Sequence, residues 1–163
     1  MNKLLRLRRG LAKWTIPVGL MLSALALAAP ILSTKPSGRA ADRWEKLYSS
    51  ILPAGYSEFR ARWQSQDVGV HIFSFRCPAA TQRDQVFDHI VARLPGFRVS
   101  DKQTNEVALR RPATYSDPGG FDEFRIIYVP DTREFVAMYA NLDSEFDVHD
   151  KLVAKMHDIA DRP

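Results

Sequence analysis

The sequence predicts an α+β domain: a mostly antiparallel sheet of about four to six strands flanked by two main helices, preceded by an N-terminal membrane-anchor or signal helix. Composition is the first observation, because 45% hydrophobic and 26% charged residues in a chain of 163 are typical of one packed domain with a short extension. Short segments of alternating branched and aromatic residues are the second. Two longer segments with helical apolar periodicity, one before the main run of strands and one after it, are the third.

The N-terminal part of the chain predicts export or anchoring. Residues 1–13 form a basic flank, 14–34 an uncharged apolar run and 35–41 a short linker before the domain of 42–163. As a helix, the apolar run would span about 31 Å, which matches the hydrocarbon core of a bilayer. The basic flank places the start of the chain in the cytoplasm. We therefore expect a single-pass membrane protein with its C-terminal domain outside the cytoplasm.

Other N-terminal signals remain open. Ala26-Leu27-Ala28 is a small-x-small match for signal cleavage, which would leave a secreted or periplasmic domain. The pair Arg8-Arg9 partly matches a twin-arginine signal. An arginine-rich segment without acidic residues is also a feature of mitochondrial presequences.

The domain opens with a short predicted helix. Asp42 and Glu45 have the spacing of a capping box, and Pro53 and Gly55 end the helix. Its apolar stripe is expected to consist of Trp44, Leu47, Tyr48 and Ile51.

Strands and a second helix follow the first. A helix capped by Thr81, with Asp84 three residues on, ends before Pro95 and Gly96. Its apolar stripe consists of Val86, Phe87, Ile90, Val91 and Leu94. Strands are predicted at 59–63, 68–75, 97–102, 106–111, 124–129 and 134–140.

The strands at 97–102 and 106–111 are predicted to form a hairpin, and the last two strands form a second one around Pro130 and Asp131. A terminal helix then begins near Asp143 or Ser144. Its spacing predicts that Phe146, Val153, Met156 and Ile159 are buried.

The charge distribution argues against nucleic-acid binding. The chain as a whole carries +4, but seven basic residues and no acidic one precede Asp42. From Asp42 onward, 16 basic residues face 19 acidic ones, which gives a net charge of −3. A domain that neutralises phosphates needs the opposite balance.

The residues that could carry chemistry are few. Cys77 is the single cysteine, so a disulfide within the chain and a multi-cysteine metal site are excluded. It is expected to be a small buried hydrophobe, and His71 a satisfied residue of the core or sheet face. His149-Asp150 and His157-Asp158 are expected to be solvated helix charges, and we predict no metal and no cofactor. Common hydrolase, phosphate-loop and dinucleotide motifs do not occur.

The loop at 112–120 is the candidate binding element, because it is longer than a simple connection. Its candidate binding residues are Tyr115, Asp117, Gly119 and Gly120. The sequence thus favours a noncatalytic accessory domain of a cell envelope that binds a protein or an envelope component. A small exported enzyme using Cys77 or a His/Asp pair is one alternative. A periplasmic ligand carrier, which requires an apolar cavity between sheet and helix, is another.

Overall fold

The structure, a computed structural model, describes residues 33–34, 36–65, 69–113, 120–142 and 146–162. The predicted anchor or signal segment therefore lies outside the described residues, apart from Ser33 and Thr34. Among the residues described, no helix has both the length and the apolar character needed to cross a bilayer.

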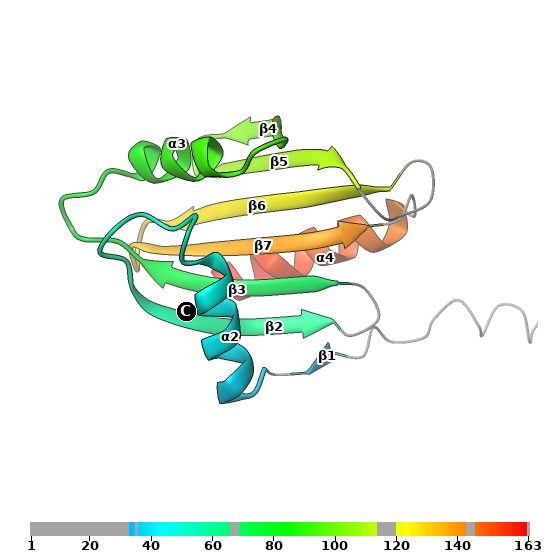
Figure 1. Cartoon of the computed structure of the whole chain (residues 1–163), viewed down its shortest axis with the longest axis horizontal. Helices are drawn as coiled ribbons and strands as arrows, with labels where there is room; N and C mark the ends of the chain where they lie inside the picture. Colours follow the sequence, from blue (N-terminus) through cyan, green and yellow to red (C-terminus); the bar gives the residue numbers. More distant parts are fainter. Residues whose placement is uncertain (1–32, 35, 66–68, 114–119, 143–145, 163) are drawn as a thin grey trace, which may run out of the picture. The chain divides into compact units, whose positions relative to one another are not determined.

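An antiparallel sheet forms the centre of the domain, as the sequence predicts (Figure 1). Its six longer strands are β2 (Ser57–Ser65), β3 (Val70–Arg76), β4 (Arg98–Gln103), β5 (Glu106–Pro112), β6 (Phe121–Val129) and β7 (Glu134–Leu142). The two-residue strand β1 (Ser33–Thr34) pairs with β2, and the strand order is β1-β2-β3-β7-β6-β5-β4. The described helices are α2 (Gly38–Tyr48), α3 (Arg83–Arg93) and α4 (Phe146–Ala160).

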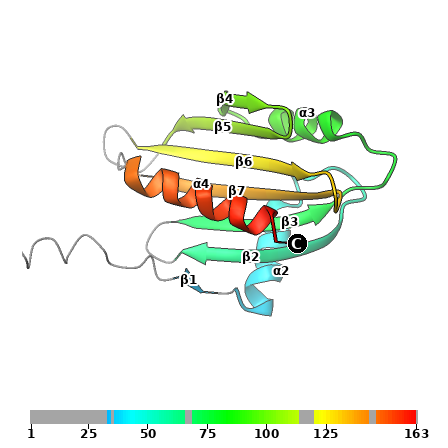
Figure 2. The same cartoon turned by 180° about the vertical axis from the view of Figure 1, so that it is seen from behind.

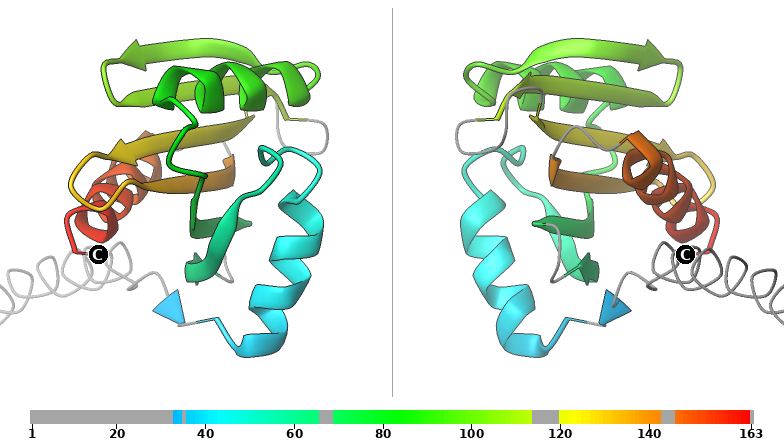
Figure 3. Two further views of the ribbon diagram at one scale, coloured as in Figure 1. Left: turned by 90° about the vertical axis from the view of Figure 1, so that its left-hand side faces the viewer. Right: turned by 90° about the vertical axis from the view of Figure 1, so that its right-hand side faces the viewer.

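The helices cover both faces of the sheet. Helices α2 and α3 lie on one face, and α4 lies on the other (Figure 2). Figure 3 shows the sheet edge-on between these layers. The main core, between the sheet and α2 and α3, is built from aromatic and branched residues that alternate along the strands, such as Phe73, Phe75, Leu109, Phe124 and Phe135. The fold therefore belongs to the α+β class, with three helices in the described part.

Helix α2 starts earlier than the sequence indicates. It begins at Gly38, where the Ser37 side chain accepts a hydrogen bond from the Ala40 amide, and not after Asp42. Trp44 and Tyr48 are buried as predicted. Leu47 is 58% exposed, so its expected place in the buried stripe is wrong. Its position is the rim of the cleft described below.

Helix α3 has the predicted stripe but a different cap. Val86, Phe87 and Ile90 are buried against the sheet, as the spacing predicts. The cap is Gln82 and not Thr81, and the Gln82 amide donates to the Gln85 side chain.

Helix α4 is rotated relative to the predicted stripe. Its buried residues include Leu152, Met156 and Ala160, whereas Val153 and Ile159 are partly exposed. The burial predicted for the side chain of Phe146 lies outside what the structure describes. The rotation arises because His149 also faces the sheet, where it meets a buried carboxylate.

Strand β2 departs from simple alternation. A register shift between Ala61 and Trp63 leaves Ala61 opposite Phe73 and Trp63 opposite Ile72. Such a bulge moves the following side chain to the other face of the sheet. Phe59 and Ala61 accordingly pack on the main core, while Trp63 lies on the face that α4 covers. The predicted hairpins β4–β5 and β6–β7 are confirmed.

Candidate ligand-binding cleft

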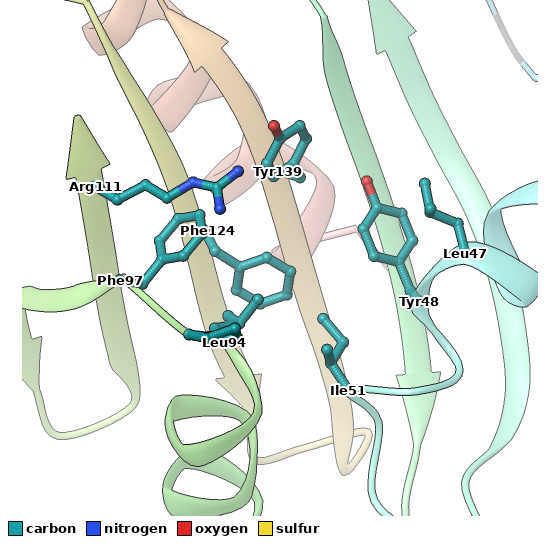
Figure 4. Close-up of a pocket in the computed structure, with 9 residues that line it drawn as sticks. Leu47, Tyr48, Ile51, Leu94, Phe97, Arg111, Phe124 and Tyr139 are labelled. Atoms are coloured by element: carbon teal, nitrogen blue, oxygen red, sulfur yellow. The ribbon is translucent and has the colours of Figure 1, made fainter. Parts of the chain in front are cut away.

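A cleft of about 300 Å³ opens between the ends of α2 and α3, over strands β5, β6 and β7 (Figure 4). Apolar side chains form most of its lining. The lining residues are Leu47, Tyr48, Ile51, Leu94, Pro95, Phe97, Arg111, Phe124 and Tyr139. Its volume is at the lower end of the range that small-molecule sites occupy.

The two walls of the cleft come from the points where helices end. Leu47 and Tyr48 belong to the last turn of α2, and Ile51 follows it. Leu94 and Pro95 end α3, because proline lacks the amide that would continue the helix. Neither helix extends across the sheet, so the space between their ends stays open above Phe124.

One end of the cleft is polar. The Arg111 guanidinium points toward Tyr139 (Figure 4) and donates from Nε to Asp122 Oδ2 at 2.7 Å. Asn141 Nδ2 donates to the other oxygen of Asp122 at 2.6 Å. Burial, followed by the charge of Asp122, raises the pKa of Tyr139, so its hydroxyl remains protonated. The Arg111 guanidinium also lies over the ring of Phe97, 4.7 Å from its centroid.

A second polar contact lies behind the cleft wall. Tyr48 Oη and His71 Nδ1 are 2.8 Å apart. Burial raises the pKa of Tyr48, while burial and then the charge of Arg43 lower the pKa of His71. Both groups are therefore neutral near pH 7, and the tautomer of His71 decides which of them donates in this hydrogen bond.

The cleft lining suits binding better than bond cleavage. It offers an apolar wall, a charged guanidinium and neutral hydroxyls, but neither a thiol nor a carboxylate is among its lining residues. Such a site fits an apolar body with a hydrogen-bond acceptor at one end.

The opposite face of the sheet carries a buried ion network. Glu123 is fully buried and accepts from Arg110 Nε at 2.6 Å and Arg125 Nε at 2.8 Å, and His149 Nε2 lies 3.0 Å from it. Arg125 also pairs with Glu106. Burial raises the pKa of Glu123, but hydrogen bonds and charge from Arg125 and then Arg110 outweigh it and lower the pKa.

This network corrects the prediction for His149. Its side chain is only 13% exposed and joins α4 to the sheet, so it is not a solvated helix charge. His157 is more exposed and lies 3.3 Å from Glu106. No group of three or more potential metal ligands occurs in the part of the chain that the structure describes.

Cys77 is partly buried and packs against the main core. Burial raises the pKa of its thiol to about 11, the opposite of what a thiolate nucleophile needs. Its surroundings therefore favour the predicted role of a small hydrophobe.

Most of the residues predicted for binding fall in a part of the chain that the structure does not describe. Tyr115, Asp117 and Gly119 are outside the described residues. Gly120 is described, and its carbonyl accepts from the Ala113 amide at 3.1 Å, closing the connection between β5 and β6. Arg111 lies near the end of β5, before this connection, and the sequence analysis did not identify it as a residue of the site. The available signal was a second arginine directly after Arg110 at the end of an apolar strand.

No protein-family model, curated protein or solved structure matches the chain. Fold and site define the class: an α+β domain with an open apolar cleft on one face of its sheet and a helix fixed by buried charges on the other.

Proposed function

We propose that this chain is a noncatalytic binding domain of a cell envelope that takes an apolar ligand, polar at one end, in the cleft between α2 and α3. The cleft itself supports the proposal, since it joins an apolar wall to the Arg111–Tyr139 end at the rim of the sheet. Cys77 lies outside the cleft, and burial raises the pKa of its thiol. Cys77 therefore gives little support to the alternative of a small exported enzyme.

The membrane part of the proposal derives from residues 14–34. We propose that this segment holds the domain at a membrane, or delivers it across one, with the domain outside the cytoplasm. Alkaline phosphatase fused to the C-terminus is expected to be active, because that reporter works only after export. Activity of a cytosolic reporter at the same position, with inactive phosphatase, would refute it.

Photocrosslinking tests the cleft. The full chain in a nonionic detergent is mixed with a long-chain alcohol that carries a diazirine, irradiated and mapped by peptide mass spectrometry. We expect label on the peptides that contain Leu47–Ile51 and Leu94–Phe97, and an excess of unlabelled alcohol should remove it. Label spread evenly over the chain would contradict the proposal.

A matched pair of variants separates the cleft from general surface attachment. Ile51→Trp places a larger side chain in the cleft lining, and we expect about tenfold weaker labelling, equivalent to about 1.4 kcal/mol. Val99→Trp adds the same side chain at a site on β4 that is 50% exposed and does not line the cleft. Its labelling should equal that of the unaltered chain, and circular dichroism confirms that both variants are folded.

A further inference from the structure

A second pocket, of about 480 Å³, lies on another side of α2. We call it the arginine pocket. Its lining residues are Arg39, Ala40, Arg43, Trp44, Leu47, Gln64 and His71. Leu47 lines both the arginine pocket and the cleft, so the two hollows meet at this exposed side chain.

Two arginines line the arginine pocket. Arg39 and Arg43 lie one helical turn apart and are both exposed. Within the described ranges neither forms a salt bridge, whereas Arg110, Arg111 and Arg125 each pair with a carboxylate. No acidic residue is among the lining residues.

His71 adds an imidazole ring to the lining of the arginine pocket. Its ring stacks on Trp44 with centroids 4.2 Å apart, and its Nδ1 lies 2.8 Å from the Tyr48 hydroxyl. The other ring nitrogen, Nε2, belongs to a side chain that lines the arginine pocket, and an imidazole can hydrogen-bond a phosphate oxygen through a protonated nitrogen. Two guanidinium groups and one imidazole ring thus line the same hollow.

Resting on the function proposed for the cleft, we infer that the ligand is a phosphorylated amphiphile: its apolar part lies in the cleft with a hydrogen-bond acceptor at the Arg111–Tyr139 end, and its phosphate group lies in the arginine pocket. Guanidinium groups match phosphate oxygens in geometry and charge. The volume of the arginine pocket, about 480 Å³, leaves room for a phosphate group together with the atoms that join it to the apolar part. The exposed Leu47 lies where the apolar part would pass between the two hollows.

The test compares two photoreactive probes of equal chain length, an alkyl phosphate and the corresponding alcohol, on the full chain in a nonionic detergent. We expect half-maximal labelling by the phosphate at a concentration at least about tenfold lower, as for an added charge-assisted contact. Equal labelling by both probes would overturn the inference and leave the function proposed for the cleft intact. Labelling by neither probe would overturn both.

Charge variants locate the phosphate. In Arg39→Gln/Arg43→Gln the preference for the phosphate probe should disappear while labelling by the alcohol is unchanged. Lys46→Gln is the matched control, because Lys46 is an exposed cation of the same helix that lines neither hollow. Equal loss in Lys46→Gln, or a preference that survives in the double variant, would overturn the inference.

Competition identifies the source of the phosphate. Protection from labelling by vesicles containing phosphatidylglycerol, compared with diacylglycerol, indicates a membrane phospholipid. Protection by a short soluble alkyl phosphate alone indicates a free phosphate ester. Protection by neither would overturn the inference.

Discussion

Removing the charge of Glu123 is expected to destabilise the domain strongly. Glu123→Gln keeps the shape of the side chain but leaves Arg110 and Arg125 beside a neutral, fully buried group. Breaking a buried ion pair costs about 3–5 kcal/mol. Arg125 retains Glu106 and the Arg110 side chain is 36% exposed, so we expect the lower end, about 3 kcal/mol.

Urea unfolding of the full chain in a nonionic detergent, followed by fluorescence of the buried Trp44 and Trp63, measures this loss. Glu58→Gln is the control, because Glu58 also pairs with two arginines, Arg60 and Arg76, but its side chain is 41% exposed. Its cost should lie within about 1 kcal/mol. Equal effects of the two substitutions would refute the reasoning.

The stabilisation that Glu123 provides is expected to depend on pH in a defined direction. The pKa of Glu123 is lower in the folded chain than in the unfolded one, so its stabilisation is complete above the unfolded value of about 4.3. The stabilisation is lost as the pH falls through the folded value. The difference between the unaltered chain and Glu123→Gln should therefore be constant from pH 7 to about 5 and shrink at lower pH. A difference that grows on acidification would contradict the assignment.

Two further predictions concern the segment around Cys77. With the pKa of its thiol raised to about 11, Cys77 should react with iodoacetamide at pH 8 about 100-fold more slowly in the folded chain than in urea, as mass spectrometry would show; equal rates would contradict the burial. Gly55 has φ +78°, and a Cβ there would lie 3.3 Å from Pro78 Cγ, so Gly55→Ala should cost at least about 1 kcal/mol in urea unfolding. Gly38→Ala is the control, because an alanine methyl group at the start of α2 would meet nothing within 4 Å, and it should be neutral or stabilising; a similar loss in both variants would exclude the conformational explanation.

Most helices and strands could be predicted because each leaves a pattern in a short stretch of sequence. Period-two alternation identified the meander from β4 to β7, and the stripe of Val86, Phe87 and Ile90 identified α3. The start of α2 was missed because an Asp42–Glu45 spacing resembles a cap, whereas Ser37 supplies the actual one. The bulge in β2 has no comparable sequence signal.

The site was harder to predict because it depends on contacts between distant segments. Leu47 has helical spacing for burial, but α3 ends before it could cover this side chain. In the sequence alone, His149 has the features of a solvated helix charge. In the structure, the register of β5 and β6 places Arg110 opposite Glu123, and His149 meets this pair. The ion network depends on this pairing, and the cleft depends on where α2 and α3 end.

Neighbouring residues of β5 and β6 serve opposite faces of the sheet. Arg111 and Phe124 line the cleft, whereas Arg110 and Glu123, their immediate neighbours in the chain, hold α4. Alternate positions along β5 and β6 could therefore be varied to change the lining of the cleft, while the positions between them are kept to hold α4 on the sheet. Inserting or deleting one residue within either strand would exchange the two sets and ruin both.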